Sequence, residues 1–142
     1  MTRVRAIKIL ALVIYGVFLI ALSVFKTAEL FLPAIYGLED FFGGDKLMHL
    51  KLSMVLAVLA LMAFIPTSVG KSQIKSFNLL LRAVGVCILL IAGLFADELH
   101  QALVSTRRFE WWDFAYGISG IVIGLSLFLL GCFLRNVLRN VL

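Results

Sequence analysis

Residues 114–134 read FAYGISGIVIGLSLFLLGCFL, a run of 21 residues without a charged side chain. At about 1.5 Å rise per residue, a helix over this run is roughly 30 Å long and matches the hydrocarbon core of a bilayer. The whole chain has this character, because 63% of its 142 residues are hydrophobic and only 15% are charged. A globule of such composition lacks the polar surface to cover itself in water. The sequence therefore predicts an integral membrane protein.

Three more apolar runs precede this one. We predict a single all-α domain over residues 1–142, a bundle of four transmembrane helices at about 7–25, 46–65, 78–103 and 114–134. The first run also fits the apolar core of a cleaved signal peptide, because Ala21-Leu22-Ser23 offers small residues at the spacing of a cleavage site. Between the first two spans, residues 27–44 predict a short segment on the outer leaflet, interrupted by Pro33 and Gly43-Gly44.

The charges predict an orientation. If the N-terminus is cytoplasmic, the inner side holds eight basic residues and no acid, and the outer side holds all eight acids. Positive charge in short loops marks the cytoplasmic side, so we expect both termini to be cytoplasmic. The net charge of +5 does not indicate nucleic acid, because the basic residues form no stripe interleaved with aromatic residues. Cys87 and Cys132 lie in apolar runs and are interpreted as small hydrophobic residues.

The second and third spans are short in their apolar parts. Leu52–Ile65 and Ala83–Ala96 have 14 residues each, so each helix covers roughly 21 Å and falls about 9 Å short of the hydrocarbon. Polar neighbours should then enter the outer leaflet. These neighbours are Asp45, Lys46, His49 and Lys51 on the second span and Asp97, Glu98, His100 and Gln101 on the third.

A different register keeps those groups at the headgroups. The second span would slide inward through Thr67, Ser68 and Gly70, and the third would use residues 77–96. We favour the deeper register because Pro66 discourages inward continuation of the second helix. A third helix that continues to about Val104 also moves the negative end of its dipole away from Asp97 and Glu98. Asp45 with His49, and Asp97 with Gln101, would each share one helix face.

These residues resemble a pattern of the VanZ-like family, small bacterial membrane proteins named for a member linked to resistance to the glycopeptide antibiotic teicoplanin. The pattern has Asp-Lys-x-x-His at the start of one span, here residues 45–49, and Asp-Glu-x-x-Gln later, here residues 97–101. An arginine six residues beyond corresponds to Arg107, and Asp113 opens a glycine-rich final span. The resemblance covers about residues 45–124.

The resemblance implies a four-span fold, the inner membrane of a bacterium and a role in the cell envelope, without a defined reaction. Two positions depart from the pattern. Gly117 stands where the family commonly has Asn, and Ser105-Thr106 stands where Pro-Gly often precedes the arginine. The missing amide bears on a shared activity more than on a shared fold.

The sequence thus predicts a polar site in the outer leaflet, whose members are Asp45, Lys46, His49, Asp97, Glu98, Gln101, Arg107 and Asp113. Asp45 and Asp113 could instead be N-caps or simply occupy favourable positions in the helix dipole. No catalytic residue, cofactor or bound metal is assigned, and we expect His49 to be hydrogen-bonded to a carboxylate.

Three functions remain open. The favoured one is binding of an envelope lipid or glycopeptide-like group, with Arg107 and Lys46 contacting an anion and Asp97, Glu98 and Gln101 contacting amides or sugar hydroxyls. The second is a metal-dependent hydrolase of a lipid headgroup, with Asp45, His49, Asp97 and Glu98 as ligands. The third is a small oligomeric, proton-coupled transporter, since Gly120-x-x-x-Gly124 offers a close-packing face that permits dimers.

Overall fold

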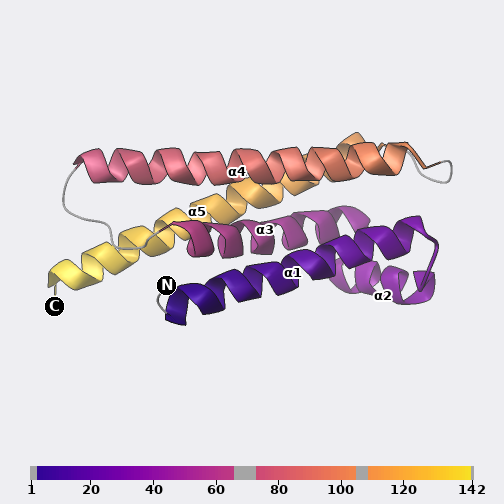
Figure 1. Ribbon diagram of the computed structural model, residues 1–142, viewed down its shortest axis with the longest axis horizontal. Helices are drawn as coiled ribbons and strands as arrows, with labels where there is room; N and C mark the ends of the chain where they lie inside the picture. The colour runs from indigo at the N-terminus through magenta and orange to yellow at the C-terminus, as the bar shows by residue number, and fades with distance from the viewer. Residues whose placement is uncertain (1–2, 66–72, 105–108, 142) are drawn as a thin grey trace.

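The computed structural model describes residues 3–65, 73–104 and 109–141, and this part of the chain contains helices and no strand (Figure 1). The helices are α1 (Arg3–Thr27), α2 (Leu32–Phe42), α3 (Asp45–Phe64), α4 (Gln73–Ala102) and α5 (Trp111–Val141). Four of them, α1, α3, α4 and α5, are long and apolar enough to cross a membrane. The predicted all-helical fold with four spans is confirmed, and the chain is a multi-pass membrane protein.

The short helix α2 occupies the segment that we predicted to lie between the first two spans. Pro33 stands in its first turn, where the missing N–H leaves no bond unmade, so this proline starts the helix rather than interrupting it. The helix ends at Gly43, which has φ 91°. Only glycine adopts this left-handed conformation without strain, and it turns the chain directly into α3.

The ends of α3 and α4 bear on the predicted register. Helix α3 stops at Phe64, and Ile65 is extended at φ −104° and ψ 121°, as expected for a residue before a proline. The alternative extension through Thr67, Ser68 and Gly70 lies outside the described residues. Helix α4 continues past Asp97 and Glu98 to Ala102, which confirms the longer third helix. The carboxylates are therefore set back from its negative end.

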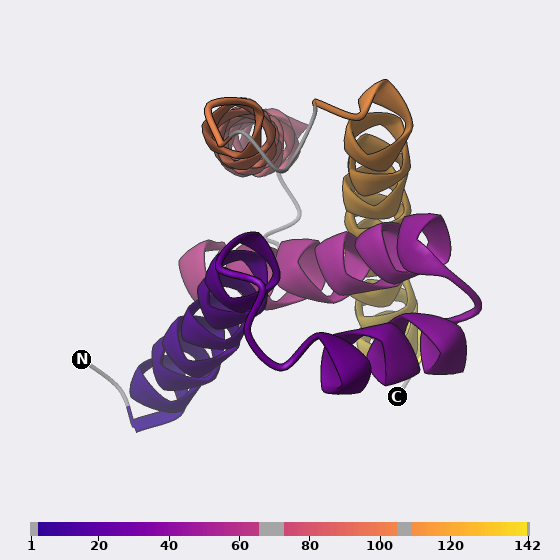
Figure 2. The ribbon, with the colours of Figure 1, turned by 90° about the vertical axis from the view of Figure 1, so that its right-hand side faces the viewer.

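Helix α3 is the centre of the bundle and packs against each of the other four helices. Helix α4 lies on one side of it and α1 on the other, while α5 crosses it and α2 runs beside its first turns (Figures 1 and 2). The beginning of α1 and the end of α5 lie at the same end of the bundle (Figure 1).

The closest packing joins α3 to α5 through two glycines. A Cβ added at Gly120 would overlap the carbonyl oxygen of Leu50, and one at Gly124 would lie 2.7 Å from the carbonyl oxygen of Met54. The predicted close-packing face therefore exists, and it is covered within a single chain. Around it lies a core that includes Ala57, Leu61, Ile121, Phe128 and, from α4, Ala83 and Cys87. Cys87 is buried and Cys132 half-buried, and both are free thiols.

Candidate functional site

Polar side chains from all five helices make contacts at one end of the bundle. This end lies opposite the beginning of α1 (Figure 1). They come from the last turns of α1 and α4, the first turns of α3 and α5, and from α2. This convergence follows from the up-and-down course of the helices, which brings the ends of α1 and α4 and the beginnings of α3 and α5 to the same end of the bundle (Figure 1).

Lys26 joins three of these helices. Its Nζ lies 2.6 Å from Oε1 of Glu39 on α2 and 2.7 Å from Oδ1 of Asp45 on α3. The three side chains are only 12 to 29% exposed, so water screens these ion pairs less than pairs on an open surface. Sequence reasoning did not place Lys26 or Glu39 in the site. The available signal was the position of Lys26, directly at the end of the apolar run Ile9–Phe25.

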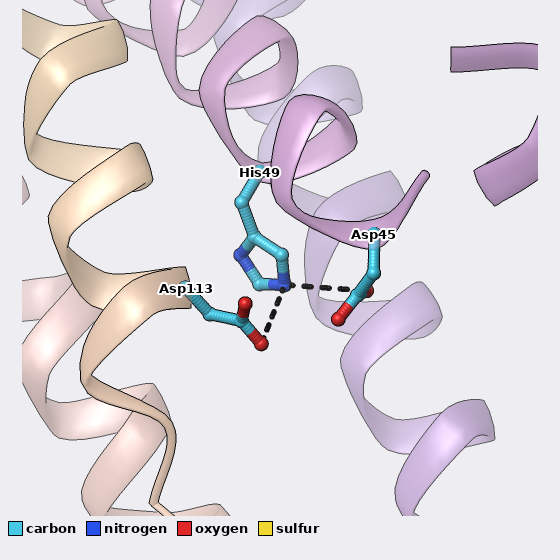
Figure 3. A group of neighbouring side chains, drawn as sticks. All are labelled: Asp45, His49 and Asp113. Atoms are coloured by element: carbon cyan, nitrogen blue, oxygen red, sulfur yellow. Dashed lines mark ion pairs between the residues drawn. The ribbon is translucent and has the colours of Figure 1, made fainter. Parts of the chain in front are cut away.

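Asp45, His49 and Asp113 form a second group, shown in Figure 3. The Nε2 atom of His49 lies 3.8 Å from Oδ1 of Asp45 and 3.9 Å from Oδ2 of Asp113. Asp113 is only 3% exposed, and its Oδ1 has no hydrogen-bond partner among the described residues. One possible ligand atom from each residue lies within 4.8 Å of the other two. The predicted shared face of Asp45 and His49 is confirmed.

The N-cap interpretation of Asp45 is wrong. Gly44 is the N-cap of α3, and no side chain caps the helix. Asp45 lies in the first turn, where its carboxylate is favoured by the helix dipole but is directed to Lys26 rather than to the backbone. Asp113 likewise lies in the first turn of α5.

Asp97 is the centre of a third group. Its Oδ1 accepts a hydrogen bond of 2.7 Å from Oγ of Ser23, and its Oδ2 accepts one of 2.9 Å from Nε2 of Gln101. The first bond joins α1 to α4, and the second confirms that Asp97 and Gln101 share a helix face. The sequence indicates Ser23 only as part of a cleavage site, because it does not show that α1 contacts α4.

The remaining predicted site residues are Glu98, Lys46 and Arg107, and the charge of Glu98 acts on Asp113 of the second group. Glu98 is 4% exposed, and its Oε2 accepts a long bond of 3.4 Å from the backbone N–H of Glu110. Lys46 is on the surface, with Nζ 4.0 Å from Oε2 of Glu110 and 45% of its side chain exposed. Arg107 lies outside the described residues. The structure therefore brings together Asp45, His49 and Asp113, with Glu98 near Asp113, and separately Asp97 and Gln101.

A cavity of about 100 Å³ lies beside His49 of the second group and Asp97 of the third group. Its polar lining comes from Ser23, Lys26, His49, Ser53, Asp97 and Gln101, and its apolar lining comes from α1 to α4, mainly from leucines. Gly117 stands close to this lining, since a Cβ there would lie 2.9 Å from Cδ1 of Leu94 and 3.4 Å from Oγ of Ser53. The position where the VanZ-like pattern commonly has Asn is thus adjacent to the cavity wall.

The metal ligands suggested by the hydrolase alternative are only partly together. Asp45 and His49 face each other, but Asp97 bonds to Ser23 and Gln101, and Glu98 to the backbone of Glu110. The third possible ligand beside Asp45 and His49 is instead Asp113.

Comparison with known proteins found no matching family model, no matching curated protein and no matching solved structure. The VanZ-like assignment therefore stays a prediction from the sequence pattern.

Proposed function

We propose that the chain is a VanZ-like protein of the bacterial inner membrane that binds the polar part of an envelope lipid in the outer leaflet. Both termini are then cytoplasmic, and the polar end of the bundle faces outward. The observation that carries this proposal is the mixed lining of the cavity, which is polar beside Asp97 and His49 and apolar along Leu19, Leu22 and Leu56. Such a lining complements a molecule with a polar head joined to a hydrocarbon chain.

The size of the cavity limits what enters it. A volume of about 100 Å³ is smaller than the roughly 150 Å³ cavity that holds one benzene molecule. Only a group of a few atoms would fit, such as the terminal amine, amide or hydroxyl of a headgroup. A larger glycopeptide-like ligand would insert one such group and leave the rest at the surface.

The charges favour a group that donates hydrogen bonds. Lys26 is already engaged with Glu39 and Asp45, while each Asp97 oxygen has a further lone pair beyond its bond to Ser23 or Gln101. An ammonium, amide or hydroxyl group would complement these acceptors. Lys46 remains half-exposed beside Glu110, so we place it at the rim, in reach of the phosphate of the same lipid. Arg107 is assigned the same role from the VanZ-like pattern alone.

The test compares two lipids that differ in donor groups. Short-chain phosphatidylethanolamine and phosphatidylcholine share phosphate and acyl chains, but only ethanolamine has N–H donors. We expect the purified full chain in detergent to bind the ethanolamine lipid at least about tenfold more tightly, because a hydrogen bond to a charged group contributes about 1.5–3 kcal/mol.

One variant and one control test whether Asp97 is the source of this preference for the ethanolamine lipid. Asp97→Asn removes the charged acceptor and should reduce the preference to less than about threefold. The matched control is Ser126→Ala, since Ser126 bonds to its own helix at the carbonyl oxygen of Val122, and it should leave the preference unchanged. Equal affinity of the unaltered protein for both lipids would remove the proposal.

A further inference from the structure

We propose that Asp45, His49 and Asp113 bind one divalent transition-metal ion of the Zn²⁺ class. The three side chains come from the first turns of α3 and α5 and point toward one another (Figure 3). Two carboxylates and one imidazole are a ligand set typical of Zn²⁺ and Mn²⁺, whereas Mg²⁺ and Ca²⁺ prefer oxygen ligands alone. This inference goes beyond the proposed lipid site and does not depend on it.

The distances fit an ion placed between the three groups. Ligand atoms about 2.1 Å from a tetrahedral ion lie roughly 3.4 Å from one another. The Nε2 atom of His49 is 3.8 Å from Oδ1 of Asp45 and 3.9 Å from Oδ2 of Asp113. One possible ligand atom from each residue lies within 4.8 Å of the other two. Small side-chain rotations would therefore bring them to coordination distance without a change in the backbone.

A buried oxygen of Asp113 gives an independent indication. Asp113 is 3% exposed, and among the described residues its Oδ1 has no hydrogen-bond partner. A buried acceptor without a partner costs about 1–3 kcal/mol, and more when it is charged. A cation bound between Asp113 and His49 would satisfy this carboxylate and offset its repulsion with Asp45.

The surrounding helices hold the three ligands in place. The close approach of α3 and α5 at Gly120 and Gly124 fixes the two backbones that carry the ligands. Lys26 bonds to Oδ1 of Asp45 and orients that carboxylate, as outer groups commonly do around metal sites. Its positive charge opposes the ion, so we expect moderate rather than extreme affinity. Three protein ligands leave the fourth coordination position of a tetrahedral ion open. One of these ligands, His49, also lines the cavity.

The test measures metal binding by the full chain without any lipid. Protein purified in detergent and stripped with a chelator is titrated with Zn²⁺ against a fluorescent competitor, and the bound metal is counted after gel filtration. We expect one ion per chain. Asp113→Asn and His49→Gln should each weaken binding at least about tenfold, whereas Asp40→Asn, which changes an exposed acid on α2, should have no effect.

A second measurement needs no variant. Co²⁺ added to the stripped protein should give the visible absorption of a four-coordinate site with nitrogen and oxygen ligands, and excess Zn²⁺ should abolish it. The proposal is overturned if the unaltered protein binds less than about one-tenth of an ion per chain, or if both ligand variants bind Zn²⁺ as it does. Because lipid is absent from these titrations, their failure leaves the proposed lipid site untouched, and the lipid test is repeated in chelator to keep the two separate.

Discussion

At the scale of single residues, Lys26 has the largest structural role in the polar end. One ammonium group accounts for both ion pairs that attach α2, through Glu39, and the start of α3, through Asp45, to the last turn of α1. Removing it would leave two carboxylates close together and largely shielded from water. In such cases the loss comes mainly from the uncompensated charges and not from the pair itself.

We expect Lys26→Met to destabilise the protein by about 1–3 kcal/mol, less than the 3–5 kcal/mol of a fully buried pair because the three side chains keep some exposure. Unfolding in mixed detergent micelles measures this difference. The matched control is Lys46→Met, because Lys46 and Glu110 are 45% and 57% exposed and 4.0 Å apart, and such pairs contribute about 0–1 kcal/mol. Similar losses in both variants would contradict the role given to Lys26.

Residue pairs on one helix were predictable, and pairs between helices were not. The spacing of four residues correctly placed His49 beside Asp45 and Gln101 beside Asp97, because helix geometry alone fixes those contacts. The contact of Ser23 with Asp97 and those of Lys26 with Glu39 and Asp45 join different helices. They depend on which helices become neighbours and at what height, and hydrophobic runs carry little information on either.

At the scale of helices, α3 and α5 are the most closely packed pair of the bundle. At Gly120 and Gly124 the backbone of α5 lies directly against the backbone of α3, so there is no space for a side chain at either position. The spacing of small residues predicted a close approach, but not its partner, which could equally have been a second copy of the chain. The number and approximate limits of the spans were predictable because apolar length must match the bilayer.

Gly120→Ala should separate α3 from α5 and destabilise the protein by about 1–3 kcal/mol, because the added methyl group overlaps the carbonyl of Leu50 and backbone atoms must move. The same substitution at Gly131, where a Cβ would have no neighbour within 4 Å, should be neutral or slightly stabilising. Thermal unfolding of both variants in one detergent separates these outcomes. A fully stable Gly120→Ala protein would show that this contact is loose.

At the scale of the whole molecule, the two ends differ in charge. The described part of the end where α1 begins carries Arg3, Arg5 and Lys8, while the other end gathers acids beside the exposed Trp111 and Trp112. Tryptophan is common at membrane interfaces, and basic residues are common on the cytoplasmic side. These features support the proposed orientation.

Cysteine labelling in intact cells tests that orientation. With Cys87 and Cys132 replaced by Ala, a single cysteine at the exposed position of Asp40 should react with a maleimide that does not cross membranes. A single cysteine at the exposed position of Arg5 should react only after lysis. Both variants should be labelled in detergent extracts, which controls for their expression. The opposite pattern in cells would reverse the proposed topology.

The separation of α1 from α4 has a consequence for how a ligand would arrive. In the described residues these two helices do not pack along their lengths, and the bond from Ser23 to Asp97 links them beside the cavity. The lipid of the proposed function would therefore enter laterally from the outer leaflet, and its acyl chains would remain in the bilayer. It would avoid the penalty of about 0.8 kcal/mol for each methylene drawn into water, and only the headgroup would have to shed its hydration.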